Sequence, residues 1–399
     1  MRLRKYKTTK KRWIAFFTLA AITILLTLLK RIEAVSEHIF TQGFSRAWVF
    51  VFGHISSLFP FSLFEVFIVI AVGYTVASIT IWIVCAAKKN GYLFKQSFSV
   101  FCLVVMSIFT VYSAVASPAY YRAESNEIPF ASTLSAEEVF AMSSWYYSEL
   151  NSLAAKFERN EETNRVVSPY TFDELSQKMA EEYKRFDGNY LSSYTPRAKP
   201  SFLTFMWKEF RILGIAFLPL GEGVMHADSA PVYLVHTMAH ELAHTKGVMK
   251  ENDANLLAYY VTFSAEDDFI RYCAMLYLRY DLWFMVKQYP GGDLVNSLME
   301  ETAHPGIFAD EYEVPGYWPK LNLFAYLSSF FNNLYLKLSG VKDGMDSYED
   351  KNEQLEIVPL PPVDPSLPTP PTLPPFFTVM VDDVQKMMIS VYQSQTEQR

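Results

Sequence analysis

Three of the chain's seven histidines lie four residues apart in the stretch HTMAHELAHTKGVMKENDAN, residues 236–255. If this stretch is helical, His240 and His244 lie one turn apart on one face, where two imidazoles can bind a single metal ion. Glu241, next to the first of them, can then reach a water on the metal and accept its proton. This is the H-E-x-x-H arrangement of zinc peptidases, in which the metal lowers the pKa of that water towards neutrality.

A zinc site of this kind needs a third protein ligand and leaves one coordination position open. Gly247 ends the predicted helix, and a second helix begins near Glu251. The spacing favours Glu251 as the third ligand, with Asp253, which points from a different face, as the alternative. Asn255 lies one turn after Glu251 and can hold a ligand from behind.

The chain contains other histidines and tyrosines that could contribute to such a site. His236 lies two turns from His244, which is too far for both to bind one ion, so a role in packing or in supporting a ligand is favoured. The weaker candidates for contacting a substrate or stabilising a transition state are His226, His304, Tyr277 and Tyr280.

Three apolar runs in the first 120 residues are each long enough to cross a bilayer. They cover residues 13–29, 66–87 and 98–116, and no signal-peptide cleavage site follows the first. Residues 47–61 are too short and too broken by Gly and Pro for a further span, and are predicted to lie at the membrane interface or to re-enter the membrane. Glu65, at the mouth of the second span, is predicted to be interfacial.

Basic residues are concentrated before the first run and in the loop between the second and third, which holds Lys88, Lys89 and Lys95. By the positive-inside rule both segments are cytoplasmic, so that everything beyond residue 118 lies outside the cytoplasm. The sequence therefore predicts a multi-pass protein of the cell membrane with residues 1–117 as its anchor.

Composition limits the possible functions. The net charge of −7 argues against general nucleic-acid binding. The chain has three cysteines, and two of them fall inside apolar runs, so neither a disulfide framework nor a cysteine-rich zinc site is expected. Any metal must then be held by histidine and carboxylate.

Beyond residue 118 the pattern is that of a mainly α-helical domain, extending to about residue 350. Ser135 with Glu138 and Thr171 with Glu174 have capping-box spacing. β-structure is limited to the stretch IAFLPLGEGVMHA, whose Gly and Pro suggest at most a small edge strand or an extended loop. For residues 351–375 the sequence predicts a proline-rich linker, and for residues 376–399 it predicts a short amphipathic helix.

The block HELAH…G…E…AN within residues 214–259 resembles the signature region of a bacterial membrane family, the domain of unknown function 3810, whose members join N-terminal spans to a zincin-like domain. The stretch NNLYLKLSGVKDGMDSY is similar to the family's C-terminal region. HELAH with ENDAN is also similar to the gluzincin pattern. That resemblance implies His240 and His244 as ligands, Glu241 as the base, Glu251 as the third ligand and Asn255 as its supporting residue.

Two departures from the gluzincin pattern matter. Many gluzincins have Asp at the position of Asn255, and the gap between the second histidine and the ligand glutamate is shorter here, so the turn at Gly247 must be tight. Metzincins, which share H-E-x-x-H-x-x-G, need His or Asp at the position of Lys250.

These features predict a membrane-anchored, Zn²⁺-dependent metallopeptidase in which Glu241 activates a zinc-bound water to hydrolyse peptide bonds outside the cytoplasm. The expected partners are the lipid bilayer and a peptide or protein substrate, with membrane or envelope proteins favoured by proximity. The stretch GEGVMHA could align an extended substrate by strand addition. The alternative is a non-catalytic membrane scaffold or receptor with a structural zinc. A transporter or sensor is less favoured because Glu65 lies at the edge of a span rather than at its centre.

Overall fold

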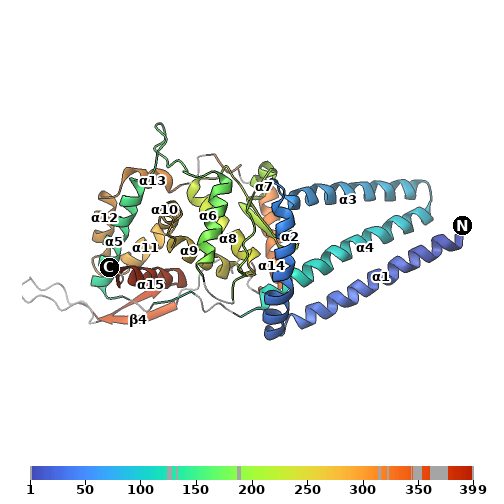
Figure 1. The fold of residues 1–399 in the computed structure, drawn as a ribbon, viewed down its shortest axis with the longest axis horizontal. Coiled ribbons are helices and arrows are strands. Elements are labelled where there is room, and N and C mark those ends of the chain that lie inside the picture. The colour runs from blue at the N-terminus through green and yellow to red at the C-terminus, as the bar shows by residue number, and fades with distance from the viewer. Residues whose placement is uncertain are drawn as a thin grey trace, which may run out of the picture.

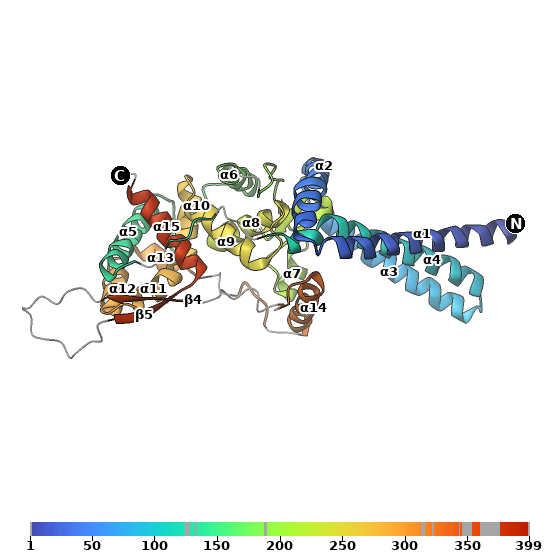
Figure 2. The ribbon, with the colours of Figure 1, turned by 90° about the horizontal axis from the view of Figure 1, so that it is seen from below.

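Three long apolar helices form one end of the molecule and a larger, mainly helical domain forms the other, as the computed structural model shows (Figures 1 and 2). The structure describes residues 2–397 except 124–127, 132–133, 187–189, 313–315, 321–322, 343, 345–352 and 360–375. Most of the described residues are helical, which confirms the predicted mainly α fold with three apolar N-terminal helices.

The three predicted spans are continuous helices, each with a stretch long and apolar enough to cross a membrane. They are α1 (Arg2–Leu29), α3 (Leu63–Ala87) and α4 (Gly91–Val115). Both α1 and α3 pack against α4, and the hydroxyls of Thr23 in α1 and Thr110 in α4 are hydrogen-bonded at 2.8 Å. The N-terminus and the turn between α3 and α4 lie at the same end of the molecule, far from the domain (Figure 1).

The segment between α1 and α3 forms the base of the domain. It folds into a π-helix, η1 (Val35–Ser45), and α2 (Arg46–Ser57), and α2 crosses the end of the domain from which the spans emerge (Figures 1 and 2). The indole Nε1 of Trp48 donates to the carbonyl of Pro219 at 3.0 Å. Trp48 and Val49, within the stretch predicted to be interfacial, are thus packed on the domain.

The domain core lies where α8 packs against α9 and α10. Both predicted capping boxes form, one at the start of α5 and one at the start of α6. The helices of this part are η2 (Ser117–Tyr121), α5 (Ala136–Ala154), α6 (Phe172–Lys184), α7 (Thr204–Phe210), η3 (Leu218–Leu220), α8 (Pro231–Thr245), α9 (Glu251–Phe263), α10 (Asp268–Tyr277), α11 (Arg279–Lys287), α12 (Gly292–Glu301), α13 (Pro305–Asp310) and α14 (Leu323–Ser339).

A three-stranded sheet covers α8. Its order is β1-β3-β2, with β3 parallel to β1 and antiparallel to β2. The strands are β1 (Lys199–Pro200), β2 (Gly214–Phe217) and β3 (Glu222–Met225). The stretch GEGVM, which sequence analysis offers as an edge for strand addition, is therefore the central strand. That expectation is wrong because the two-residue strand β1, which has no sequence signal of its own, pairs with its other side.

The end of the chain differs from the sequence prediction. Strands β4 (Glu353–Pro359) and β5 (Phe376–Val381) form an antiparallel pair, and α15 (Asp383–Glu397) follows. The predicted linker is thus a strand over residues 353–359, and its residues 360–375 lie outside the described part. The predicted helix begins only at Asp383, because the preceding aromatic and β-branched run has strand propensity and pairs with β4. α15 docks on the domain core through buried residues such as Met387 and Met388.

Candidate metal centre

The turn at Gly247 brings the motif helix α8 and the following helix α9 together. Gly247 has φ of +95°, a left-handed conformation that L side chains rarely adopt, and a methyl group there would lie 2.9 Å from Cγ2 of Thr41. α8 begins with Pro231 at its first turn, a position where proline costs no backbone hydrogen bond. α9 begins at Glu251, so that the first residue of one helix faces the last turns of the other.

Among the described residues, one group of His, Cys, Asp or Glu side chains has the geometry to hold a metal ion, and it consists of His240, His244 and Glu251. Their ligand atoms all lie within 4.8 Å of one another. Oε2 of Glu251 is 3.2 Å from Nε2 of His240 and 3.5 Å from Nε2 of His244. Asp253, the alternative third ligand, instead lies 3.9 Å from the ammonium of Lys250.

The donor atoms of this cluster fit a cation. Nδ1 of His244 is 2.7 Å from the carbonyl of Val248, so it carries the proton of the neutral ring and leaves the Nε2 lone pair facing Glu251. A lone pair and a carboxylate oxygen at this distance repel each other unless a proton or a metal ion lies between them. The charge of Glu251 accordingly raises the pKa of His244 to about 9 against the effect of burial. Burial opposes ionisation of Glu251, but the two histidines outweigh it and lower its pKa.

Glu241 lies beside the cluster, between α8 and the edge strand β2. Its carboxylate accepts a hydrogen bond from the backbone N–H of Ala216, and burial raises its pKa. A methyl group at Gly214 would lie 2.7 Å from Cγ and Oε1 of Glu241, and one at Gly223 would lie 3.3 Å from its Cβ. Glycine at both positions therefore makes room for this side chain. Gly214 and Gly223 were not predicted as part of the site, although each stands in a strand, where glycine often marks a close backbone approach.

His236 lies one helical turn before His240 in α8, and Asn255 lies one turn after Glu251 in α9. The ring of His236 stacks on Tyr277 and Tyr259, with centroid distances of 4.3 and 4.7 Å. Its side chain is hydrogen-bonded to Asn255, and burial lowers its pKa to about 3. His236 in turn packs 6.2 Å from the ring of His240. Asn255 thus contacts His236, which packs beside the ligand candidate His240, and its predicted role in supporting a ligand stays a prediction.

Arg122 clamps the turn between the two helices, and no local sequence signal predicts it. Its Nη1 donates to the carbonyl of Gly247 at 2.8 Å. Its Nε and Nη2 donate to the carboxylate of Glu37 at 2.8 and 2.7 Å. Its guanidinium stacks over the ring of Tyr190 at 3.7 Å. Although burial opposes it, the pair with Arg122 lowers the pKa of Glu37. η1, at the base of the spans, is thereby tied to the turn that sets the position of Glu251.

The remaining candidates lie elsewhere. His304 accepts a hydrogen bond from the N–H of Gly306 as the cap of α13. The hydroxyl of Tyr280 is hydrogen-bonded to Tyr312 at 2.9 Å, and Tyr277 belongs to the stack on His236.

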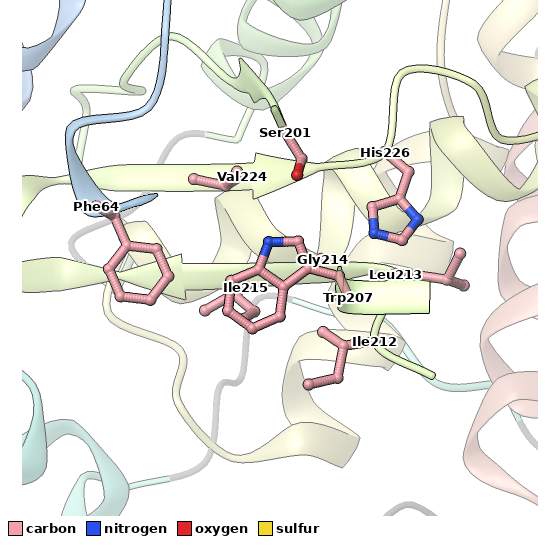
Figure 3. Close-up of a pocket in the computed structure, with 9 residues that line it drawn as sticks. All are labelled: Phe64, Ser201, Trp207, Ile212, Leu213, Gly214, Ile215, Val224 and His226. Carbon is pink, nitrogen blue, oxygen red and sulfur yellow. The ribbon is translucent and has the colours of Figure 1, made fainter. Parts of the chain in front are cut away.

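His226, which follows β3, lines a small pocket on the opposite face of the sheet from α8 (Figure 3). Ile215 and Val224 face this pocket, while the alternating positions 214 and 223 face Glu241. Nδ1 of His226 is 2.8 Å from the hydroxyl of Tyr317, and Nε2 is buried without a hydrogen-bond partner in the part of the chain that the structure describes. Burial lowers its pKa to about 4, with Asp228 opposing the shift and Lys208 adding to it.

Because the pKa of His226 is lowered, we expect the protein to lose stability in acid. Because its folded pKa lies below the unfolded value near 6.5, its contribution is present above pH 6.5 and is lost as the pH falls through 4. We expect a loss of up to about 3 kcal/mol over that window, and a smaller loss in His226→Gln, which keeps a partner for Tyr317. Thermal unfolding of both proteins between pH 7 and pH 4 measures it. If the wild type and His226→Gln lost the same stability between pH 7 and pH 4, groups other than His226 would be responsible for the loss.

One protein family matches most of the chain. A protein family described as "Protein of unknown function (DUF3810)" matches residues 40–353. The matched range begins in η1 and ends at the first residue of β4, so it contains α3, α4 and all residues of the candidate centre. No curated protein and no solved structure matches the chain.

Proposed function

This chain belongs to the DUF3810 family of proteins of unknown function, and we propose that it is a membrane-anchored zinc metallopeptidase of the zincin type. The ligands would be His240, His244 and Glu251. The proposal depends above all on one observation: Nε2 of His240 and Nε2 of His244 both lie close to the same carboxylate oxygen of Glu251. The buried carboxylate of Glu241 lies beside this group. Three histidine and carboxylate ligands with an open fourth position are typical of catalytic zinc sites.

The chain's own residues supply a base and a place for a substrate. Zinc bound here would act as a Lewis acid that polarises a peptide carbonyl and lowers the pKa of a water. Glu241 would accept the proton of the attacking water and pass it to the nitrogen of the leaving amine. Its raised pKa suits both steps, because a group that titrates closer to neutral pH can accept and then release a proton. β2, the edge strand beside Glu241, is where an extended peptide could add to the sheet.

We further propose that the domain lies outside the cytoplasm. The basic N-terminus and the turn with Lys88 and Lys89 share the end of the molecule far from the domain (Figure 1), and the positive-inside rule makes that end cytoplasmic. A peptidase so placed would first meet membrane and envelope proteins at the extracytoplasmic surface.

Metal content of the purified full-length chain tests the ligand set. The full chain is needed because η1 and α2 pack on the domain, so a fragment that begins after the spans lacks the Glu37 that anchors Arg122. We expect about one zinc ion per chain in the wild type and little or none in Glu251→Ala, since a catalytic zinc site needs all three protein ligands.

Asp253→Ala is the matched control, because Asp253 is the neighbouring carboxylate in the same helical turn. It should keep the zinc of the wild type. Zinc retained by Glu251→Ala and lost by Asp253→Ala would move the third ligand to Asp253. A wild-type chain that takes up no zinc would overturn the proposed function.

A further inference from the structure

Helix α14 turns most of its large apolar side chains outward. Phe324, Tyr326, Phe330, Phe331 and Leu334 are all exposed, with Tyr326 71% exposed. On the side of α14 that faces the domain, Leu336, Ala325 and Ser339 are buried, and Leu327, Ser328, Asn332 and Asn333 are half-buried. A helix on the water-exposed surface of a globular protein turns its large apolar side chains toward the core instead.

The exposed apolar face continues onto two neighbouring segments at the same end of the domain. Leu58 and Phe61, which are 79% and 42% exposed, precede α3 directly and so stand where that span meets the domain. Phe205 of α7 is 73% exposed. Together with the exposed residues of α14 they form what we call the collar.

Each part of the collar is connected to a span by hydrogen bonds or by the chain itself. α7 is held to α3 because the carboxylate of Glu65, in the first turn of α3, accepts hydrogen bonds from the N–H of Phe202 and the indole of Trp207 at 2.8 and 2.7 Å. Glu65, which the sequence predicts at the mouth of the span, is thus buried between α3 and α7. α14 is held to α4 because the hydroxyls of Tyr335 and Tyr112 are hydrogen-bonded at 2.6 Å.

α14 lies crosswise to the spans, at the end of the domain nearest to them (Figures 1 and 2). In both views α14 lies at the end of the domain from which the spans emerge, and it runs across the direction of the spans (Figures 1 and 2). A helix in that position lies in the plane of a bilayer that the three spans cross. Its one charged residue, Lys337, stands in the last turn, from which a lysine can extend to the headgroups.

We propose that the collar is immersed in the extracytoplasmic surface layer of the bilayer, with α14 as a membrane-surface helix. Lipid is the occupant because the apolar face is continuous with three lipid-spanning helices, and helices of this kind bury their apolar side about 5–10 Å into the headgroup and acyl-chain boundary. The domain then rests on the membrane, and the candidate metal centre lies close to it. Leu336 of α14 and Met249 of the turn after the motif helix belong to one buried cluster.

Depth-dependent quenching in the full-length chain tests this position. Single cysteines would replace Phe331 and Phe205 in a chain with Cys102→Ser, be labelled with an environment-sensitive fluorophore, and be placed in phosphatidylcholine nanodiscs whose acyl chains are brominated near the headgroup. The matched control is Leu294→Cys on α12, which is 66% exposed at the opposite end of the domain (Figure 1).

We expect the labels at 331 and 205 to lose most of their fluorescence in brominated lipid and the label at 294 to lose none, in chains whose thermal unfolding matches that of the unlabelled protein. Equal fluorescence at all three sites would overturn the proposal. A label at 331 that responds to protein concentration but not to brominated lipid would also overturn it, by assigning the face of α14 to a second copy of the chain. The outcome does not depend on whether zinc binds or peptides are cleaved.

Discussion

Glu241→Gln is expected to keep its zinc and to lose peptide hydrolysis by about 10²–10⁴-fold, the usual contribution of a general base. Glutamine has the shape of glutamate, so it fits the space left by Gly214 and Gly223, and its carbonyl oxygen can still accept the hydrogen bond from Ala216. It cannot accept a proton. The loss should therefore appear in kcat with little change in KM, since binding of the substrate does not require the charge.

The assay would use fluorescently labelled casein and a mixed library of quenched peptides, because the natural substrate is unidentified. Asp253→Asn is the control, since it removes a neighbouring carboxylate that is not part of the cluster. Full activity in Glu241→Gln would exclude this residue as the base. A wild-type chain that holds zinc yet cleaves none of these probes would favour the alternative of a scaffold or receptor with a structural zinc.

The sequence predicts those parts of the centre that depend on short separations along the chain. His240 and His244 share a helical face because four residues make about one turn, and Glu251 reaches them because only six residues and a glycine turn intervene. The three apolar helices are equally local, since their length and composition alone identify them. These features follow from periodicity and need no knowledge of the rest of the fold.

Contacts between distant segments could not be predicted in this way. Arg122 is 85 residues from Glu37, and nothing in either segment indicates the partner. The order of the sheet depends on β1, which is two residues long. α14 shows a further limit: its apolar and polar residues have helical spacing, but spacing does not show which face is turned outward.

Glu222 is the residue with the largest expected effect on stability. It is fully buried, and its carboxylate accepts hydrogen bonds from the hydroxyls of Ser56 and Ser62 and from the N–H groups of Leu63 and Phe64, the last two at 3.0 and 2.9 Å. It therefore caps the N-terminus of the span α3, where a negative charge is also favoured by the helix dipole.

Removing this carboxylate should destabilise the whole junction between the spans and the sheet. Glu222→Ala would leave four donors without an acceptor, and it would leave the buried ammonium of Lys199, which donates to the carbonyls of Ser56 and Phe59, without its nearby negative charge. We expect the free energy of unfolding to fall by about 3–5 kcal/mol, as when one partner of a buried charged pair is removed. Denaturant unfolding of the full chain in detergent, followed by circular dichroism, measures this change.

Two variants separate the role of this carboxylate from a general effect of losing an acid. Glu137→Ala removes an exposed glutamate from the first turn of α5 and should cost about 0.3–1 kcal/mol. Glu222→Gln keeps the shape and one acceptor oxygen, so it should fall between the two. If Glu222→Ala cost no more than Glu137→Ala, the carboxylate would not be what holds α3 to the sheet. Gly223, the next residue in β3, packs on Glu241. A large loss of stability in Glu222→Ala should therefore also weaken zinc binding and hydrolysis at the candidate centre.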